Sequence, residues 1–207
     1  KAYIGMITVF YMLAIYFARK KDLLADEESK QLIKDMKALP DQIAGIIENS
    51  EDKIKDLAAE YAQNENAFFI GRSVDNAVVQ EGALKLKEIS YIHAESYPAG
   101  ELKHGTLALV EEGVPVIALA TQPSVKEKTL SNVKEVKARG GVVTGVVFGE
   151  EEELEDLDYR FEIPETSEVL TSILSVVPLQ LLAYYVAVER GCDVDQPRNL
   201  AKSVTVE

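Results

Sequence analysis

The sequence predicts an α/β protein: a three-layer α/β/α sandwich with a mainly parallel sheet of about five strands, preceded by helices. Two observations carry this prediction. Several short segments are continuously apolar, which is typical of strands buried on both faces of a sheet. They alternate with longer stretches that have the hydrophobic period of helices. The 207 residues, 47% of them hydrophobic, are enough for one domain of ordinary size.

The first part of the chain, residues 1–65, is expected to be all-helical. Residues 27–39 and 41–48 have helical patterns, and Pro40 separates them because proline disrupts a helix interior. Residues 50–63 have a further amphipathic pattern, with apolar side chains on one face. We therefore expect three separate helices after the first one.

The first helix is expected over residues 2–18, which carry no charge and are followed by Arg19, Lys20 and Lys21. Their length and flanking charges come close to those of a transmembrane helix. We favour burial in a dimer or interdomain core, because tyrosine and threonine side chains are spread around this helix. A membrane-anchored protein is the alternative.

The second part, residues 66–192, is the predicted α/β core. Strands are expected at residues 67–70, 95–97, 114–120, 142–148 and, as an edge strand, 159–163. Helices are expected at residues 78–91, 124–138 and 168–190. Ser124 with Glu127 predicts a capping box on the second of these helices, and Pro178 is expected to interrupt the third. Ligands in such folds bind beyond the carboxyl ends of the strands.

The composition excludes several classes of function. The formal net charge of −13 opposes nucleic-acid binding as the main role, because a polyanion would be repelled. Cys192 is the only cysteine, so a disulfide framework is excluded and a reducing, cytoplasmic location is favoured. Two histidines without cysteine help make no convincing zinc site. We therefore predict no metal. No glycine-rich nucleotide motif follows a strand, and we predict no cofactor either.

A dense group of titratable residues lies in residues 81–109. Glu81, Lys85 and Glu88 are spaced so that they share one face of a helix. A surface ladder of ion pairs is the ordinary interpretation of that spacing. Glu88, however, lies near the end of its helix, where the helix dipole disfavours a negative charge. A carboxylate there takes up a proton more readily, as a general base must.

Two further residues have the chemistry of a sugar-phosphate site. His104 lies beside Gly105, and imidazole transfers protons near neutrality, although a lone histidine is more often structural. Lys202 lies in the C-terminal tail, where a lysine is usually solvated. Val204 and Val206 give this tail an apolar stripe that would let it dock. A docked lysine that is partly desolvated can lose its proton and attack a carbonyl.

These residues carry a resemblance to a known family. The stretches EGALKLKEISYIHAESYPAGELKHGTLAL (81–109) and VPLQLLAYYVAVERGCDVDQPRNLAKSVTVE (177–207) resemble the C-terminal part of the glucosamine-6-phosphate synthase family. Both stretches are long and specific. The resemblance implies the sugar isomerase (SIS) fold, an α/β/α sandwich with a parallel sheet, in agreement with the strands expected above.

The resemblance also implies roles for individual residues. Glu88 matches the base that moves a proton between carbons 1 and 2 of the sugar. His104 is similar to the histidine that helps to open the sugar ring of the neighbouring subunit, and Lys202 to the lysine that forms a Schiff base with the ketose. Substrate-binding positions are matched by Lys85, Glu81 and Ala201.

The implied activity is synthesis of glucosamine 6-phosphate from fructose 6-phosphate and glutamine-derived ammonia, in a cytoplasmic homodimer without nucleic-acid or membrane partners. In that family a glutaminase domain and a first SIS domain precede this region. We therefore expect a single SIS domain, with a helical part (1–65), a core (66–192) and an active-site tail (193–207). Because the family's phosphate loop belongs to the first SIS domain, the fragment alone is expected to be weakly active or inactive.

Two points stay open at the level of sequence. Residues 121–124 follow a strand and precede a helix, a place that attracts anions, but we interpret them as a structural cap. A non-catalytic SIS module that binds phosphosugars for regulation is the alternative to an enzyme. Replacing Glu88 separates these two functions.

Overall fold

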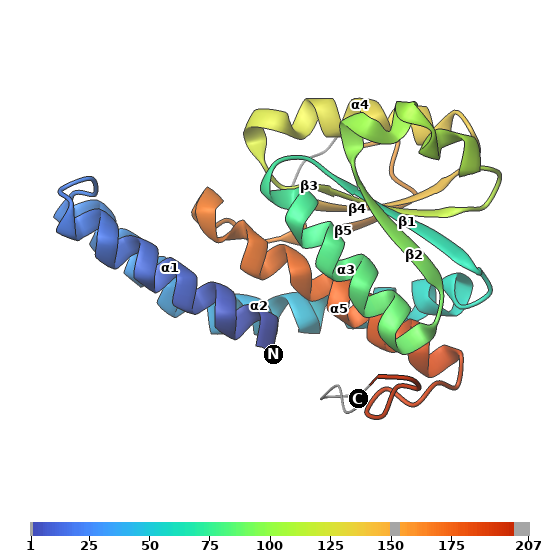
Figure 1. Cartoon of the computed structure of the whole chain (residues 1–207), viewed down its shortest axis with the longest axis horizontal. Helices are drawn as coiled ribbons and strands as arrows, with labels where there is room; N and C mark the ends of the chain where they lie inside the picture. The colour runs from blue at the N-terminus through green and yellow to red at the C-terminus, as the bar shows by residue number, and fades with distance from the viewer. Residues whose placement is uncertain (1, 150–153, 201–207) are drawn as a thin grey trace, which may run out of the picture.

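One sheet of five parallel strands forms the centre of the molecule (Figure 1). The computed structural model describes residues 2–149 and 154–200. In chain order the strands are β1 (Asn66–Gly71), β2 (His93–Pro98), β3 (Pro115–Ala120), β4 (Val142–Phe148) and β5 (Tyr159–Ile163). Their order in the sheet is β2–β1–β3–β4–β5, with β5 at one edge. The predicted parallel sheet, its number of strands and the edge position of β5 are confirmed.

Helices cover both faces of the sheet, which explains why its strands are apolar without alternation. On one face lie α3 (Val74–Ser90), α5 (Thr171–Glu189) and the end of α2 (Asp26–Tyr61); on the other lie α4 (Lys126–Lys137) and two short 3₁₀ helices (Figure 1). The two neighbours Phe68 and Phe69 of β1 belong to opposite cores. The three-layer α/β/α sandwich is therefore confirmed.

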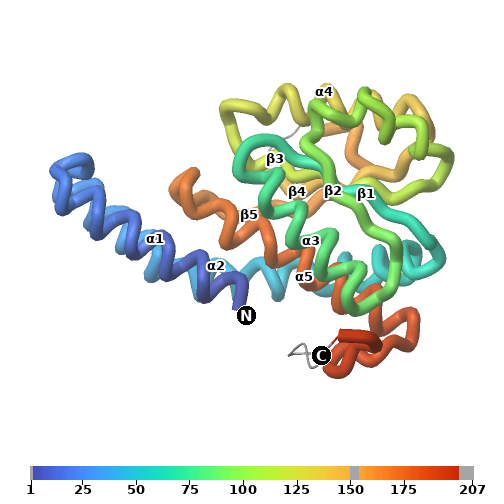
Figure 2. The backbone as a smooth tube through the Cα atoms, viewed as in Figure 1, coloured from blue at the N-terminus to red at the C-terminus, as the bar shows by residue number. Residues whose placement is uncertain are grey.

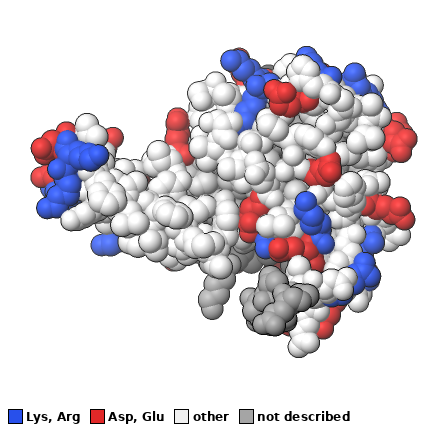
Figure 3. All heavy atoms as spheres, viewed as in Figure 1, with Lys and Arg blue, Asp and Glu red and all other residues white. Residues whose placement is uncertain are grey.

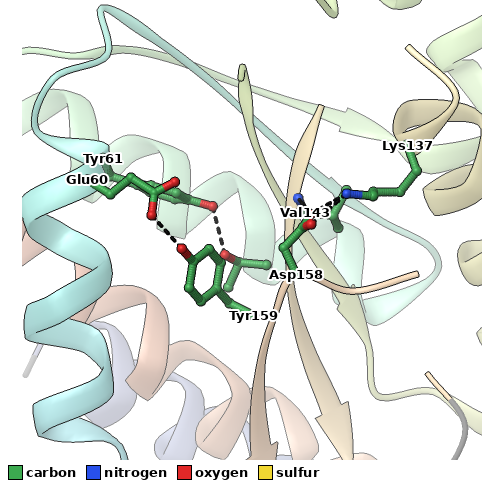
Figure 4. Close-up of polar contacts among 7 residues, drawn as sticks. Glu60, Tyr61, Lys137, Val143, Asp158 and Tyr159 are labelled. Atoms are coloured by element: carbon green, nitrogen blue, oxygen red, sulfur yellow. Dashed lines mark hydrogen bonds and ion pairs between the residues drawn. The ribbon is translucent and has the colours of Figure 1, made fainter. Parts of the chain in front are cut away.

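The edge strand β5 is held by polar contacts with elements on both sides of the sheet (Figure 4). The Asp158 carboxylate accepts a hydrogen bond from the Val143 N–H at 2.7 Å and forms an ion pair with Lys137 at 2.6 Å. The Tyr159 hydroxyl donates a hydrogen bond to Glu60 at the end of α2. These contacts fix a strand that has only one neighbour in the sheet.

α2 is one continuous helix of 36 residues, so the prediction of three separate helices was wrong. Pro40 lies inside it and is exposed to solvent. Water can therefore replace the hydrogen bond that proline cannot make. Leu39 and Ile46 are buried on either side of Pro40 along the chain. Their burial favours continuation of the helix beyond the proline.

α1 (Ala2–Lys20) forms a hairpin with α2 that extends away from the sheet (Figures 1 and 2). None of its described residues is buried, and only its first half packs against the core. Figure 3 shows that the visible face of this hairpin is largely uncharged. α1 and residues Glu168–Glu189 are both long and apolar enough to cross a membrane, but the second segment is mostly buried inside the fold. Burial of α1 by a second subunit or domain stays a prediction.

Two local predictions about helices α4 and α5 were wrong. Ser124 caps no helix, because Pro123 begins a 3₁₀ turn (Pro123–Val125) that includes it, and α4 starts at Lys126 without a side-chain cap. Gln122 is extended, as a residue before proline must be, so the helix cannot begin there. Pro178 does not interrupt α5, which runs unbroken from Thr171 to Glu189.

Candidate active site

α3 presents Glu81, Lys85 and Glu88 on the face that turns away from the core. Its inner face packs closely on α5: a Cβ added to Gly82 would lie 2.6 Å from Leu179 Cδ1. The buried residues of α3 are Asp75, Val78, Val79, Gly82, Ala83, Leu86 and Ser90. The helix therefore has a fixed position against the core, and its opposite face is free to carry chemistry.

The three charged residues predicted to share a face do lie together. Lys85 Nζ is 3.8 Å from Glu81 Oε1 and forms a closer ion pair with Glu88 Oε2. The side chains are only partly exposed: 17% for Glu81, 32% for Lys85 and 26% for Glu88. The side chains of a solvated ion pair are more exposed than this. In the pair Lys30–Glu27, for example, each side chain is more than two thirds exposed. Figure 3 shows acidic and basic side chains gathered over α3.

The beginning of α1 comes near Glu81, whose charge acts on Tyr3. Tyr3 packs against the core, and burial raises the pKa of its hydroxyl to about 12, with the negative charge of Glu81 adding to the effect. Further along α1, the Tyr11 hydroxyl lies 2.9 Å from Ser172 Oγ at the start of α5. The N-terminal helix thus lies close enough to Glu81 for its tyrosine to feel that charge.

The C-terminal tail lies at the end of α3. The Tyr91 hydroxyl accepts a hydrogen bond from the Arg198 backbone N–H at 2.8 Å, and the Arg198 guanidinium lies 4.1 Å from the centroid of the same ring. Cys192 Sγ is 3.9 Å from the Ser90 carbonyl oxygen. The tail is therefore docked through Arg198 on Tyr91, which lies three residues after Glu88 in the chain. Lys202 and Ala201 lie outside the described residues, as do Val204 and Val206.

The structure does not bring His104 to Glu88 within one chain. Glu88 precedes the amino end of β2, whereas His104 follows its carboxyl end, in the 3₁₀ helix Ala99–His104. Six strand residues span roughly 17–20 Å. The His104 side chain is 75% exposed, and its Nε2 lies 3.8 Å from Glu101 Oε2. This exposed position leaves the imidazole free to enter a site on another subunit.

Groups of the chain itself fill the place where such sheets usually bind ligands, between the carboxyl ends of β1 and β3. Asp75 is 1% exposed and accepts hydrogen bonds from the Thr121 N–H at 2.7 Å and from Thr121 Oγ1 at 2.5 Å. Burial raises the pKa of the Asp75 carboxyl, although these hydrogen bonds oppose the shift. Nearby, Arg72 binds Asn132 at 2.9 Å. A carboxylate in this position would repel a phosphate, which favours a structural role for residues 121–124.

The described residues contain no group of three or more His, Cys, Asp or Glu side chains that could hold a metal ion. The carboxylates of the candidate site instead share a lysine, which occupies the space between them. The chemistry available here is proton transfer by a carboxylate beside a fixed cation.

Comparison with known proteins then decides the family. The family model of the SIS domain matches residues 60–190. This chain belongs to the SIS domain family. The SIS fold that the resemblance implies is thereby confirmed.

Curated relatives of this SIS domain are glutamine–fructose-6-phosphate aminotransferases (isomerizing). The protein from Caldanaerobacter subterraneus subsp. tengcongensis is 55% identical over 208 residues, and the one from Thermus thermophilus is 49% identical over 211 residues. Both matches cover 100% of this chain but 34% of the relative. The chain thus spans about a third of the length of the curated relatives it matches.

Solved structures agree with this assignment. The C-terminal domain of glucosamine-fructose-6-phosphate aminotransferase from Francisella tularensis superposes with a TM-score of 0.88 at 34% identity, covering 94% of this chain and 55% of that one. Tagatose-6-phosphate ketose/aldose isomerase from Escherichia coli gives a TM-score of 0.62 at 17% identity, covering 73% of this chain and 42% of that one. The second likeness concerns the fold alone.

Sequence reasoning missed three pairs of residues that the fold brings near each other in this SIS domain. Tyr3 beside Glu81 and Tyr91 with Arg198 join segments far apart in the chain, so no local spacing could reveal them. The pair of Asp75 and Thr121 had a weak signal, since each follows the end of a buried strand and the carboxyl ends of parallel strands meet at one edge.

Proposed function

We propose that this SIS domain is the C-terminal isomerase part of an enzyme that makes glucosamine 6-phosphate from fructose 6-phosphate and glutamine-derived ammonia. The observation that carries the proposal is the partly buried row of Glu81, Lys85 and Glu88 beside the docked tail. It occurs in a chain that is 55% identical to a glutamine–fructose-6-phosphate aminotransferase. Neither a metal nor a cofactor is needed for the reaction we describe.

The chemistry begins at the ketone carbon. The Lys202 amine attacks carbon 2 of the open-chain ketose, and water leaves as the Schiff base forms. Ammonia then replaces the lysine amine, which leaves as the free base, and an imine of ammonia remains at carbon 2. The resemblance gives Lys202 this role, and it gives Ala201 the role of a substrate-binding residue.

Glu88 performs the proton transfer that follows. Its carboxylate removes a proton from carbon 1 and returns a proton to carbon 2. The hydroxyl of carbon 1 loses its proton as the imine nitrogen gains one, so that the ketose imine becomes a 2-amino aldose. Lys85 lies against the same carboxylate and supplies a positive charge for the enediolamine that forms between the two steps. Because the row is partly buried, this charge acts through a medium of lower effective dielectric than water. Glu81 holds Lys85 from the other side.

The remaining parts of the site come from outside this subunit or this domain. His104, exposed and remote from Glu88 of its own chain, opens the sugar ring in the site of a dimer mate. The phosphate is held by a first SIS domain of the full-length chain, since Asp75 fills the equivalent place here. The division into a helical part (1–65), a core (66–192) and an active-site tail (193–207), and a cytoplasmic location, belong to the same proposal.

The alternative, a phosphosugar-binding module without catalysis, has less support. A sensing module needs a phosphate site of its own, and the usual place in this fold is filled by Asp75, with Arg72 nearby. A sensor also has no need for a carboxylate that shares a lysine beside a docked tail.

Replacing Glu88 in the full-length protein tests the proposed function. Glu88→Gln keeps the shape of the side chain but cannot accept the proton, so we expect kcat for glucosamine 6-phosphate synthesis to fall by about 100-fold or more. Glutaminase activity should persist. Glu48→Gln, an exposed change on α2, is the matched control and should leave synthesis unchanged. Undiminished synthesis by Glu88→Gln would reject Glu88 as the base.

A further inference from the structure

Tyr91 has a backbone conformation that a bulky residue rarely adopts. It ends α3 with φ 62° and ψ 17°, the left-handed region in which helices usually carry glycine. A non-glycine residue held there is costly and persists where the surrounding structure requires it. The question is therefore what the Tyr91 side chain does that glycine could not.

The side chain makes two separate contacts with one residue of the tail. Its hydroxyl accepts the Arg198 backbone N–H at 2.8 Å, and its ring lies 4.1 Å from the Arg198 guanidinium. The first contact fixes the path of the tail backbone, and the second is a cation–π interaction. Together they join the end of α3 to a residue more than a hundred positions later.

The tail that Tyr91 holds is itself shaped by local contacts. The Asp193 carboxylate accepts hydrogen bonds from the Asp195 N–H at 3.0 Å and the Gln196 N–H at 2.9 Å, which forms a turn. Asn199 follows Arg198 with φ 61°. The segment thus reverses direction around Arg198, and Tyr91 is its connection to the catalytic helix.

We propose that Tyr91 is a positioning residue, which fixes the C-terminal tail at the end of α3 so that Lys202 reaches the sugar beside Glu88. This inference rests on the proposed function. Tyr91 lies three residues after Glu88, about 4.5 Å along the helix axis. Lys202 lies four residues after Arg198 in the chain. A free tail could place this lysine almost anywhere over the surface.

Two substitutions of Tyr91 and one of Arg198 separate positioning from folding. Tyr91→Gly removes both contacts while supplying the residue that φ 62° favours, so the fold should keep or raise its melting temperature. Tyr91→Phe removes only the acceptor of the Arg198 N–H. Arg198→Ala removes only the cation–π contact, because its backbone N–H remains. Tyr159→Phe is the matched control, since it removes a tyrosine–carboxylate hydrogen bond at the opposite edge of the sheet.

The experiment uses the full-length protein and two measurements. Hydrogen exchange of residues 193–200 reports the contact itself. The rate at which borohydride traps the fructose 6-phosphate imine on Lys202, followed by peptide mass spectrometry, reports positioning. For Tyr91→Gly we expect hydrogen exchange of the tail to become faster by about tenfold or more, because two contacts are lost. We expect trapping of the imine on Lys202 to become slower by a similar factor. Tyr91→Phe and Arg198→Ala should each have part of the effect, and Tyr159→Phe should have none.

Unchanged exchange in Tyr91→Gly would overturn the proposal, because the tail would then be held by other contacts. Faster exchange with unchanged trapping would overturn it too, because the held tail would not position the lysine. Failure of the proposed function has a different signature: no trapping on Lys202 in the unaltered protein, or undiminished synthesis by Glu88→Gln. Absence of trapping in the unaltered protein would also remove Lys202 as the residue that Tyr91 positions.

Discussion

At the scale of single residues, Asp75 shows how a buried carboxylate can fix the position of helix α3. Its carboxylate joins the first turn of α3 to Thr121 at the end of β3 through two hydrogen bonds. Burial raises its pKa, so the folded protein takes up a proton at Asp75 more readily than the unfolded chain does. Its ionised form at neutral pH therefore costs stability, and this cost disappears as the pH falls through the raised pKa.

Asp75→Asn should lower the free energy of unfolding by about 1–3 kcal/mol, because the amide can accept only one of the two hydrogen bonds from Thr121. The gap between the unaltered protein and the variant should widen as the pH falls from neutrality toward the ordinary value of 3.8, since only the aspartate gains stability by protonation. Urea unfolding of both proteins over this range measures the gap. A difference in unfolding free energy that stays constant over this pH range would show that the pKa of Asp75 is not raised in the folded protein.

At the scale of elements, the contact of α3 with α5 sets the position of the charged row. Gly82 lies at the closest point, where an added Cβ would meet Leu179 at 2.6 Å and Phe69 at 3.1 Å. Both neighbours are buried core residues. A methyl group at this point must therefore displace the Leu179 side chain or α3, and a shift of α3 would move the adjacent Glu81.

Gly82→Ala should destabilise the fold by about 1–3 kcal/mol through overpacking and should lower kcat for synthesis. Gly45→Ala is the matched control, because Gly45 lies within α2 and an added Cβ meets nothing within 4 Å. That substitution should stabilise by about 0.5–1 kcal/mol, since alanine favours a helix. Denaturant unfolding with a parallel synthesis assay measures both. The interpretation fails if the two variants behave alike.

The elements also define what sequence could predict. Strands such as β1 and β3 were predictable because burial on both faces requires continuously apolar residues. The row on α3 was predictable because helical spacing is local. The helix break predicted at Pro40 was wrong because burial of the residues on either side of the proline favours a continuous helix. The cap predicted at Ser124 was wrong because a turn begins at Pro123 and includes that serine. Tyr91 and Arg198 could not be paired, because only the fold brings them together.

At the scale of the whole molecule, the residue proposed to complete the candidate site lies far from the charged row of the same chain. His104 follows β2, whereas Glu81, Lys85 and Glu88 precede it. His104 and Glu88 of one chain are separated by the length of that strand. A site that needs both must combine two subunits, as a two-fold symmetric dimer does. The exposed apolar face of α1 adds a surface that a further subunit or domain could cover.

Mixing two inactive full-length variants tests the sharing of sites. Glu88→Gln and His104→Ala should each lose synthesis as homodimers. In a mixed dimer one of the two sites receives Glu88 from one subunit and His104 from the other, so a randomly mixed preparation should recover about a quarter of the original activity. Synthesis and dimer composition are measured together. No recovery in verified mixed dimers would place both residues in the same subunit's site.

The central claim is that Glu88 carries a hydrogen from carbon 1 of the sugar, and following that hydrogen tests it most directly. The measurement uses fructose 6-phosphate labelled with deuterium at carbon 1 and the full-length protein with ammonia. We predict that the unaltered protein moves label to carbon 2 or to water, and that Glu88→Gln leaves it on carbon 1 while still trapping the imine on Lys202. Loss of label from carbon 1 at the normal rate in Glu88→Gln would contradict the account.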